Sequence, residues 1–239
     1  MLEKCRKKYR NECRKKDGKA EPMKIELENV LPMDIEARSF EIITEELKGK
    51  ALEAEYAPII KRVIHTTADF EYADTLAFSP EVLPKALSAI RKGACIVTDT
   101  QMAKAGINKR VLAGFGGEVL NFMTDEDVAK QAKEQGTTRA AACMDKAAKH
   151  KGPLIFAIGN APTALVRLYE LIKEEKLKPE LIIGVPVGFV NVVQSKELIL
   201  ESGVPYIVAR GRKGGSNVAA AICNALLYLL DETRAGNQT

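Results

Sequence analysis

The chain has 239 residues, 46% hydrophobic and 28% charged, which is the composition of an ordinary globular protein. This mixture excludes a mainly disordered or collagen-like chain, and its length suits one large α/β domain or two small ones. No apolar run reaches the roughly 18 residues that a membrane span needs. The five cysteines are odd in number and scattered, so we expect free thiols in a reducing compartment and a cytoplasmic protein.

The net charge of +4 is unevenly distributed. Residues 1–20 hold nine Lys or Arg and three Asp or Glu, a local net charge of +6, and the remaining 219 residues carry −2. A nearly neutral body predicts neither a broad nucleic-acid surface nor a membrane partner. The basic head lacks the apolar core of a secretory signal, so we predict a disordered tail or frayed helix over residues 1–22. A related interpretation makes Met23 the native start.

No linker, repeat or change of composition divides the rest of the chain, so residues 23–239 are predicted to form one domain. Residues 34–64 have a helical pattern, with a turn expected at Gly49 and a weaker break at Pro58. We expect residues 34–92 to form an N-terminal helical segment packed on the domain.

Beyond residue 92, short apolar β-rich runs alternate with longer helical patterns. The predicted strands are 94–97, 119–122, 154–158, 181–185 and 206–209, and the predicted helices are 125–150, 162–176, 190–202 and 216–230. Apolar strands separated by helices are typical of a parallel sheet covered on both faces. The prediction is a doubly wound, three-layer α/β/α domain with a five-stranded parallel sheet.

Residue types at the predicted helix ends agree with this pattern. Asn160 before Pro162 is typical of a capped helix start, and Ser216 after two glycines resembles another. Lys173 and Lys176 lie where a helix is expected to end, and cations there favour the negative end of the helix dipole.

Ligands of open parallel sheets bind at the carboxyl ends of the strands. The predicted ends carry residues 98–100, 159–160, 184–188 and 210–216, all rich in Gly or polar side chains. The alternative is that these are ordinary turns, which favour the same residues for backbone reasons. Neither Walker A nor GxGxxG spacing is present, so the loops permit an anion without indicating a nucleotide.

Histidine occurs only twice. His150 lies between two lysines, and we expect it to be solvated. His65, in the string RVIHTTADF (62–70), is either a partly buried helix-end histidine hydrogen-bonded to backbone or a general acid or base, because histidine titrates near neutral pH. Neither has a second His or Cys at metal-ligand spacing, so no protein-held metal is predicted. Cys143 and Cys223 fall in helical patterns and are predicted to be core thiols.

Several strings occur together in one order: ARSF (37–40), the His65 segment, TTRAA (137–141), GNAPTAL (159–165), PVGFV (186–190) followed by SK (195–196), and RGRKGGS (210–216). In this combination the chain resembles the precorrin-8X methylmutase family of cobalamin biosynthesis, called cobalt-precorrin-8 methylmutase in the anaerobic route. The resemblance covers roughly residues 34–230. Of these strings, GNAPTAL and PVGFV are the ones specific enough to indicate the family.

The resemblance implies an isomerase that moves a methyl group from ring carbon 11 to ring carbon 12 of a corrinoid, giving hydrogenobyrinate or its cobalt-containing counterpart. It implies a flavodoxin-like fold, a homodimer and no cofactor, because any cobalt is carried by the substrate. The family's single catalytic histidine corresponds to His65. Thr66 and Thr67 are candidates to orient that imidazole.

The substrate's acetate and propionate groups need cations and hydrogen-bond donors. The candidate carboxylate clamps are Arg38, Arg139 and Arg210. The alternative for each arginine is an ordinary ion pair on the surface. Candidate hydrogen-bonding residues are Ser39, Thr138, Asn160, Ser195 and Ser216, and Gly188 and Gly211 would let backbone approach a flat ring. Asp99 either bonds a ring substituent or caps the following helix.

Two other functions stay open at this point. A non-catalytic corrinoid carrier on the same fold would bind the ligand without converting it. A nucleotide-dependent enzyme of similar fold is disfavoured by the missing phosphate-binding spacings. Whether the substrate holds cobalt is not decided by the residues.

Overall fold

The computed structural model describes residues 27–231. The predicted basic tail over residues 1–22 lies outside this range, as do Cys5, Cys13 and Met23. Of the described residues, 27–34 belong to one unit and those from Ile35 onward to a second. Residues 27–34 contain no helix or strand, and the account below concerns the second unit.

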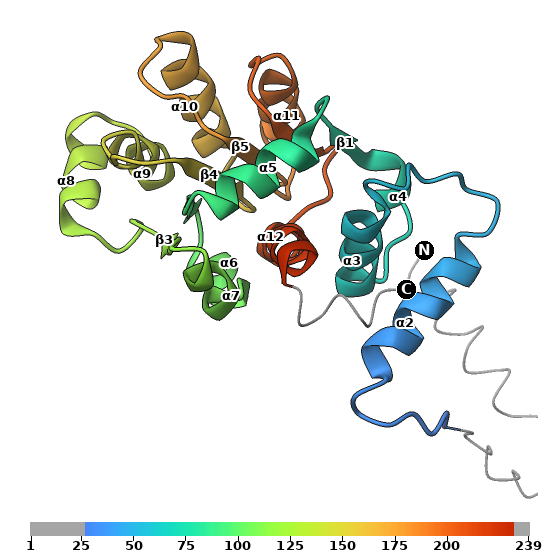
Figure 1. Cartoon of the computed structure of the whole chain (residues 1–239). Coiled ribbons are helices and arrows are strands. Elements are labelled where there is room, and N and C mark those ends of the chain that lie inside the picture. The colour runs from blue at the N-terminus through green and yellow to red at the C-terminus, as the bar shows by residue number, and fades with distance from the viewer. Residues whose placement is uncertain (1–26, 232–239) are drawn as a thin grey trace, which may run out of the picture. The chain divides into compact units, whose positions relative to one another are not determined.

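A six-stranded, mostly parallel sheet forms the centre of the second unit (Figure 1). The strands are β1 (Leu76–Phe78), β2 (Cys95–Thr98), β3 (Val119–Leu120), β4 (Leu154–Ile158), β5 (Leu181–Gly184) and β6 (Tyr206–Ala209). They lie in the order β1-β6-β5-β4-β2-β3, and every neighbouring pair except β1–β6 is parallel. All five strands predicted from the apolar runs are therefore confirmed.

The sixth strand, β1, corrects the prediction of a five-stranded sheet and of a wholly helical segment over 34–92. It pairs antiparallel with β6, and Leu76 lies opposite Ala209. Three residues are too few to show a strand periodicity, so this strand is defined by its pairing with the free edge of β6 and not by its own pattern.

Helices cover both faces of the sheet, as predicted, because alternate strand residues point to opposite faces. Ile96 and Ile155 face a core shared with α3 (Ala57–Thr67), α5 (Val82–Arg91) and α12 (Ser216–Leu230). Val97 and Phe156 face a second core shared with the helices α8 (Glu126–Glu134), α9 (Arg139–Ala147), α10 (Pro162–Lys173) and α11 (Val192–Leu200). Figure 1 shows α10 and α11 on one side of the sheet and α12 on the other. Cys143 and Cys223 are buried in these cores, and burial raises their pKa values to about 11 and about 12.

Most predicted helices are present with adjusted ends. The pattern over 125–150 divides into α8 and α9 around Gly136, which has a φ of 62°. Pro58 begins α3 instead of breaking a helix, because proline fits the first turn, where its missing N–H costs nothing. Between α2 (Ile35–Glu46) and α3 the predicted turn at Gly49 is confirmed, with a φ of 97°.

The short helix α4 (Tyr72–Thr75) lies within the predicted helical segment 34–92, whereas α6 (Gln101–Gly106) and α7 (Lys109–Gly114) have no counterpart in the prediction. No helix within residues 27–231 is long and apolar enough to cross a membrane.

Candidate functional site

The carboxyl ends of the parallel strands carry the four predicted loops, residues 98–100, 159–160, 184–188 and 210–216, which we call the rim. Helices α6, α10, α11 and α12 begin just after β2, β4, β5 and β6. Their amino-terminal N–H groups and positive dipole ends therefore lie at the same edge of the sheet, where they favour anions.

Asp99 holds two of these loops together. It is buried, and its carboxylate accepts hydrogen bonds from the backbone N–H groups of Gly159 (2.9 Å), Asn160 (2.8 Å) and Ala161 (2.6 Å). Burial raises the pKa of this carboxyl, and the three N–H donors oppose that rise. Asp99 therefore does not cap the following helix, because Thr100 does so by accepting from the N–H of Ala103 at 3.0 Å.

The same geometry corrects the predicted cap of α10. Its N-cap residue is Ala161, which makes no side-chain capping bond, and Asn160 is exposed one residue earlier. The carboxylate of Asp99, about 60 residues away in sequence, instead accepts from the N–H groups of Asn160 and Ala161, which precede the helix.

The loops after β2, β4 and β6 interlock closely. The hydroxyls of Thr100 and Ser216 lie 2.8 Å apart. A Cβ atom on Gly159 would lie 2.7 Å from the Cα of Ser216, so only glycine allows this approach. Ser216 is the first residue of α12 and not its cap.

Lys196 of α11 holds the loop of residues 210–216; the sequence named it only within a family string and not as a site residue. Its side chain is fully buried, and Nζ donates to the carbonyl oxygens of Gly211 and Lys213, each at 2.8 Å. Burial lowers the pKa of Lys196 to about 8. From the loop after β5, Gly188 donates its backbone N–H to the carbonyl oxygen of Arg212 at 3.1 Å.

The other predicted binding residues divide by exposure. Thr138 caps α9 and shares a 2.8 Å hydrogen bond with Thr163, which brings the start of α9 beside the start of α10. Arg139, the first residue of α9, is exposed. Arg210 is also exposed and lies 3.5 Å from Glu197. Ser195 is buried and donates to the carbonyl of Val192, so its hydroxyl does not reach the rim.

His65 lies in the last turn of α3 with its side chain exposed. The imidazole stacks on the ring of Phe40 from α2, with centroids 5.4 Å apart and an interplanar angle of 22°. Thr66 and Thr67 donate to the carbonyl oxygens of Arg62 and Val63, so their hydroxyls are used within the helix. Phe40 is therefore the side chain that the structure places against the imidazole.

The end of the His65 helix is tied to the rim. Lys213 Nζ lies 2.6 Å from a carboxylate oxygen of Asp69 and 2.8 Å from one of Glu71, just beyond α3. The hydrogen bond from Lys213 lowers the pKa of Asp69. This ion-pair cluster links the rim loop 210–216 to the segment that follows the histidine.

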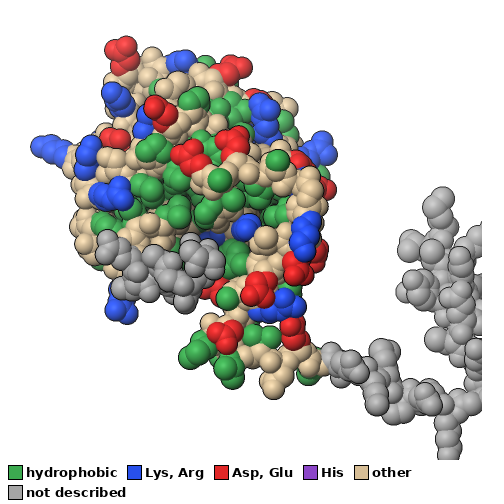
Figure 2. All heavy atoms as spheres, turned by 45° about the vertical axis from the view of Figure 1, so that its right-hand side comes forward, with side chains coloured by type: hydrophobic (Ala, Val, Ile, Leu, Met, Phe, Trp, Pro, Cys, Tyr) green, Lys and Arg blue, Asp and Glu red, His purple; other side chains and the backbone are tan. Residues whose placement is uncertain are grey.

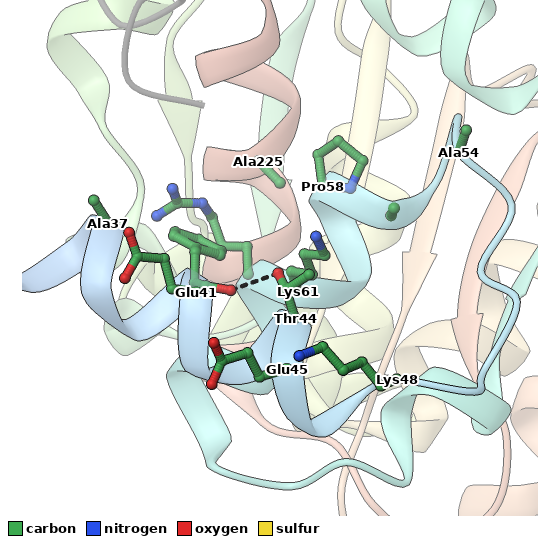
Figure 3. Close-up of a pocket in the computed structure, with 12 residues that line it drawn as sticks. Ala37, Glu41, Thr44, Glu45, Lys48, Ala54, Pro58, Lys61 and Ala225 are labelled. Atoms are coloured by element: carbon green, nitrogen blue, oxygen red, sulfur yellow. Dashed lines mark hydrogen bonds between the residues drawn. The ribbon is translucent and has the colours of Figure 1, made fainter. Parts of the chain in front are cut away.

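A cavity of about 720 Å³ opens between α2 and α3, against Ala225 of α12 (Figure 3). Figure 3 shows Glu41 and Glu45 on α2 and Lys61 on α3 around it. Phe40 and Arg62 also line it, and Arg62 lies over the Phe40 ring at 5.1 Å. His65 is not a lining residue, but it contacts the cavity wall through Phe40.

Arg38 and Ser39, the two predicted binding residues of α2, lie in the sequence between Ala37 and Phe40, which line this cavity. Arg38 pairs with Glu41 at 3.2 Å, and the hydroxyl of Ser39 donates to the carbonyl of Ile35 at 2.8 Å. Figure 2 shows hydrophobic side chains gathered at the centre of one face of the molecule, with acidic and basic side chains around them. Among residues 27–231, no group of three or more His, Cys, Asp or Glu is arranged to hold a metal ion.

Comparison with known proteins gives one consistent result. A family model described as precorrin-8X methylmutase matches residues 34–229. The chain belongs to the precorrin-8X methylmutase family. The match covers the whole sheet, the rim, and the two helices that carry Phe40 and His65.

Individual relatives agree with this assignment. The chain is 48% identical to a cobalt-precorrin-8 methylmutase of Priestia megaterium over 202 residues, which is 84% of this chain and 90% of the relative. It is also 48% identical to one of Salmonella typhimurium, covering 84% and 97%. A crystal structure of precorrin-8X methylmutase from Thermus thermophilus superposes with a TM-score of 0.77 at 36% identity, covering 84% of this chain and all of the other. This member of the precorrin-8X methylmutase family is accordingly an isomerase.

Proposed function

We propose that this methylmutase moves a methyl group from carbon 11 to carbon 12 of a precorrin-8-type macrocycle. The observation that carries the proposal is the match of residues 34–229 to the methylmutase family, which includes His65 and the complete rim. The C11–methyl bond breaks and the C12–methyl bond forms, so substrate and product are isomers and no oxidant or reductant is consumed.

In this proposal His65 is the general acid. It supplies a proton to a ring nitrogen, the resulting positive charge draws the migrating methyl, and the proton returns when the shift is complete. The exposed imidazole is open to a ligand, and stacking on Phe40 supports one orientation of its ring. A positioned acid contributes about 10²–10⁴-fold in rate, which corresponds to about 3–6 kcal/mol of barrier.

The rim would bind the substrate's peripheral carboxylates. Exposed Arg139 and Arg210 are the proposed clamps, and the starts of α9, α10 and α12 add backbone donors and positive dipole ends. Thr138, Asn160 and Ser216 add hydrogen bonds, and Gly188 and Gly211 admit the backbone close to the ring. Arg38 and Ser39 would act from α2. The buried Ser195 would support the rim from within α11 instead of touching the ligand.

We propose cobalt-precorrin-8 as the substrate in preference to its metal-free counterpart. The two relatives at 48% identity carry the cobalt-precorrin-8 name, whereas a relative from Pseudomonas aeruginosa named precorrin-8X methylmutase is 37% identical. Any cobalt would enter bound to the macrocycle, and the chain itself would use no cofactor.

We also propose a flavodoxin-like fold and a homodimer. The parallel strands β2 to β6, numbered one to five along the chain, lie in the order 2-1-3-4-5, which is the flavodoxin order. On α2, the side chains of Ile35 and Ile42 are 53% and 37% exposed, as expected of a helix that a second copy covers. Light scattering of Ile42→Glu, expected to shift the mass towards the monomer, tests the dimer.

The reaction is tested by incubating the purified protein with cobalt-loaded and metal-free precursors in parallel. The absorption spectrum should convert to that of the methyl-migrated product, faster with the cobalt-loaded precursor. Tight binding of both precursors without any spectral conversion would instead identify a corrinoid carrier. Faster conversion of the metal-free precursor would overturn the proposed substrate while leaving the reaction intact.

A further inference from the structure

The strongest feature outside the proposed reacting groups is the buried lysine beneath the rim. Lys196 lies on α11 with no exposed surface, and its only described polar contacts are the carbonyl oxygens of Gly211 and Lys213. Desolvating an ammonium group is costly. An apolar side chain would fill this space at lower cost. The two hydrogen bonds from Lys196 to carbonyl oxygens therefore need an explanation.

The two carbonyl acceptors belong to the glycine-rich loop 210–216, and Lys196 bonds its backbone from the adjacent helix α11. Residues 211–213 are exposed, and glycines with φ values of 76°, 159° and 141° occupy positions 211, 214 and 215. Such a sequence is intrinsically permissive in backbone conformation. Two charge-assisted hydrogen bonds to carbonyls two residues apart select one of its conformations.

The selected conformation determines where Lys213 points. Its carbonyl accepts from Lys196 below, while its own side chain pairs with Asp69 and Glu71 beyond the His65 helix. A continuous set of contacts thus runs from α11 through the rim loop to the segment two residues beyond the end of α3.

We infer that Lys196 is a positioning residue for methyl migration, which holds loop 210–216 so that the carboxylate-binding rim and the His65 helix keep one relative placement. This inference rests on the proposed function. Lys196 itself is buried and does not touch the substrate. Its effect passes through the backbone of Gly211 and Lys213 and through the Lys213 ion pairs.

The test replaces Lys196 by methionine, which is similar in length and apolar but cannot donate. Lys196→Met should remain folded by circular dichroism, show faster hydrogen–deuterium exchange in peptides covering 210–216, and lose about 10–100-fold in kcat/KM, since small misplacements of binding groups have effects of this size. Much of the loss should lie in KM, because the rim binds the substrate. The matched control is Lys92→Met, an exposed lysine between α5 and the amino end of β2, at the edge of the sheet opposite the rim, which should change neither the exchange rate nor kcat/KM.

A folded Lys196→Met protein with wild-type kcat and KM would overturn the inference, even if its loop exchanged faster. If that variant does not fold, Lys213→Met provides the second test, because it removes the ion pairs to Asp69 and Glu71 at an exposed position. Lys213→Met should raise KM and speed hydrogen–deuterium exchange in peptides covering 64–72. An unchanged KM together with an unchanged exchange rate would also overturn the inference. Failure of the proposed function would be recognised separately, as a wild-type protein that converts neither precursor.

Discussion

The rim and the α2–α3 side of the molecule are built in opposite ways. At the rim, buried Asp99 and Lys196 bond backbone groups of neighbouring loops, and Gly159 meets Ser216 with no space for a side chain. Around His65, the contacts are a ring stack with Phe40, and a large cavity lies open beside it. The proposed ligand-binding edge is therefore fixed by the sheet, whereas the proposed acid is carried on helices added to it.

The largest effect is expected from His65, because the proposed chemistry depends on one proton donor. His65→Ala should lower kcat by about 10²–10⁴-fold while retaining corrinoid binding, since the rim is untouched. Single-turnover absorption measurements give the rate, and equilibrium titration gives the affinity. His150→Ala, three residues beyond the end of α9, is the control. Near-wild-type turnover of His65→Ala would remove His65 from the mechanism.

On the rim side, Asp99→Asn should lower the free energy of unfolding by about 3 kcal/mol. The amide places an N–H₂ group against backbone N–H donors, and unsatisfied or weakened bonds to a charged group cost about 1–3 kcal/mol each. Urea unfolding measures the change. Asp74→Asn removes an exposed ion pair with Lys50 and should cost less than about 1 kcal/mol. Equal losses in the two variants would contradict a rim fixed by Asp99.

Arg139, at the start of α9 beside the rim, tests substrate binding without changing the buried framework of the rim. Arg139→Gln should raise KM about tenfold by removing a carboxylate clamp, and the fold should be unharmed because a cation at a helix start is unfavourable to the helix dipole. Steady-state kinetics and thermal unfolding measure the two effects. Arg91→Gln, an exposed change in the last turn of α5, is the matched control and should leave KM unaltered.

The smallest effect is a pH dependence of stability from Lys196. Its pKa is lowered by burial to about 8 from 10.5, so between these values the unfolded chain binds more protons than the folded one. Stability contributed by this group therefore rises with pH across that window. The free energy of unfolding of wild type relative to Lys196→Met should increase from pH 7.5 to pH 10 in urea titrations. A difference that stays flat over this range would contradict the lowered pKa.

Short-range patterns account for much of the fold that the sequence predicted correctly. The five parallel strands are apolar runs with helical segments between them, and the range predicted for α12 matches its observed bounds of Ser216–Leu230. Strand β1 was missed because its three residues acquire a strand conformation only by pairing with β6. The division of 125–150 was missed because the helical periodicity continues past Gly136, where the chain turns.

The sequence pointed to exposed candidate residues of the site, but not to the buried hydrogen bonds that hold its loops. His65, Arg139 and Asn160 were identified from residue type and from strings shared with a family, and all three are exposed. Asp99 bonds backbone groups about 60 residues away, and Lys196 reaches carbonyls 15 and 17 residues away. No local pattern reports such pairings.

The order of apolar and polar residues along the chain is sufficient to predict the layers of this protein and the edge of the sheet where polar loops collect, and the shared strings indicate its family. Which charges are buried, what each of them bonds, and the contact of Phe40 with His65 emerge only from the folded structure. Those contacts join elements that are distant in sequence, and they form only once packing has excluded water and left each buried polar group a single set of partners.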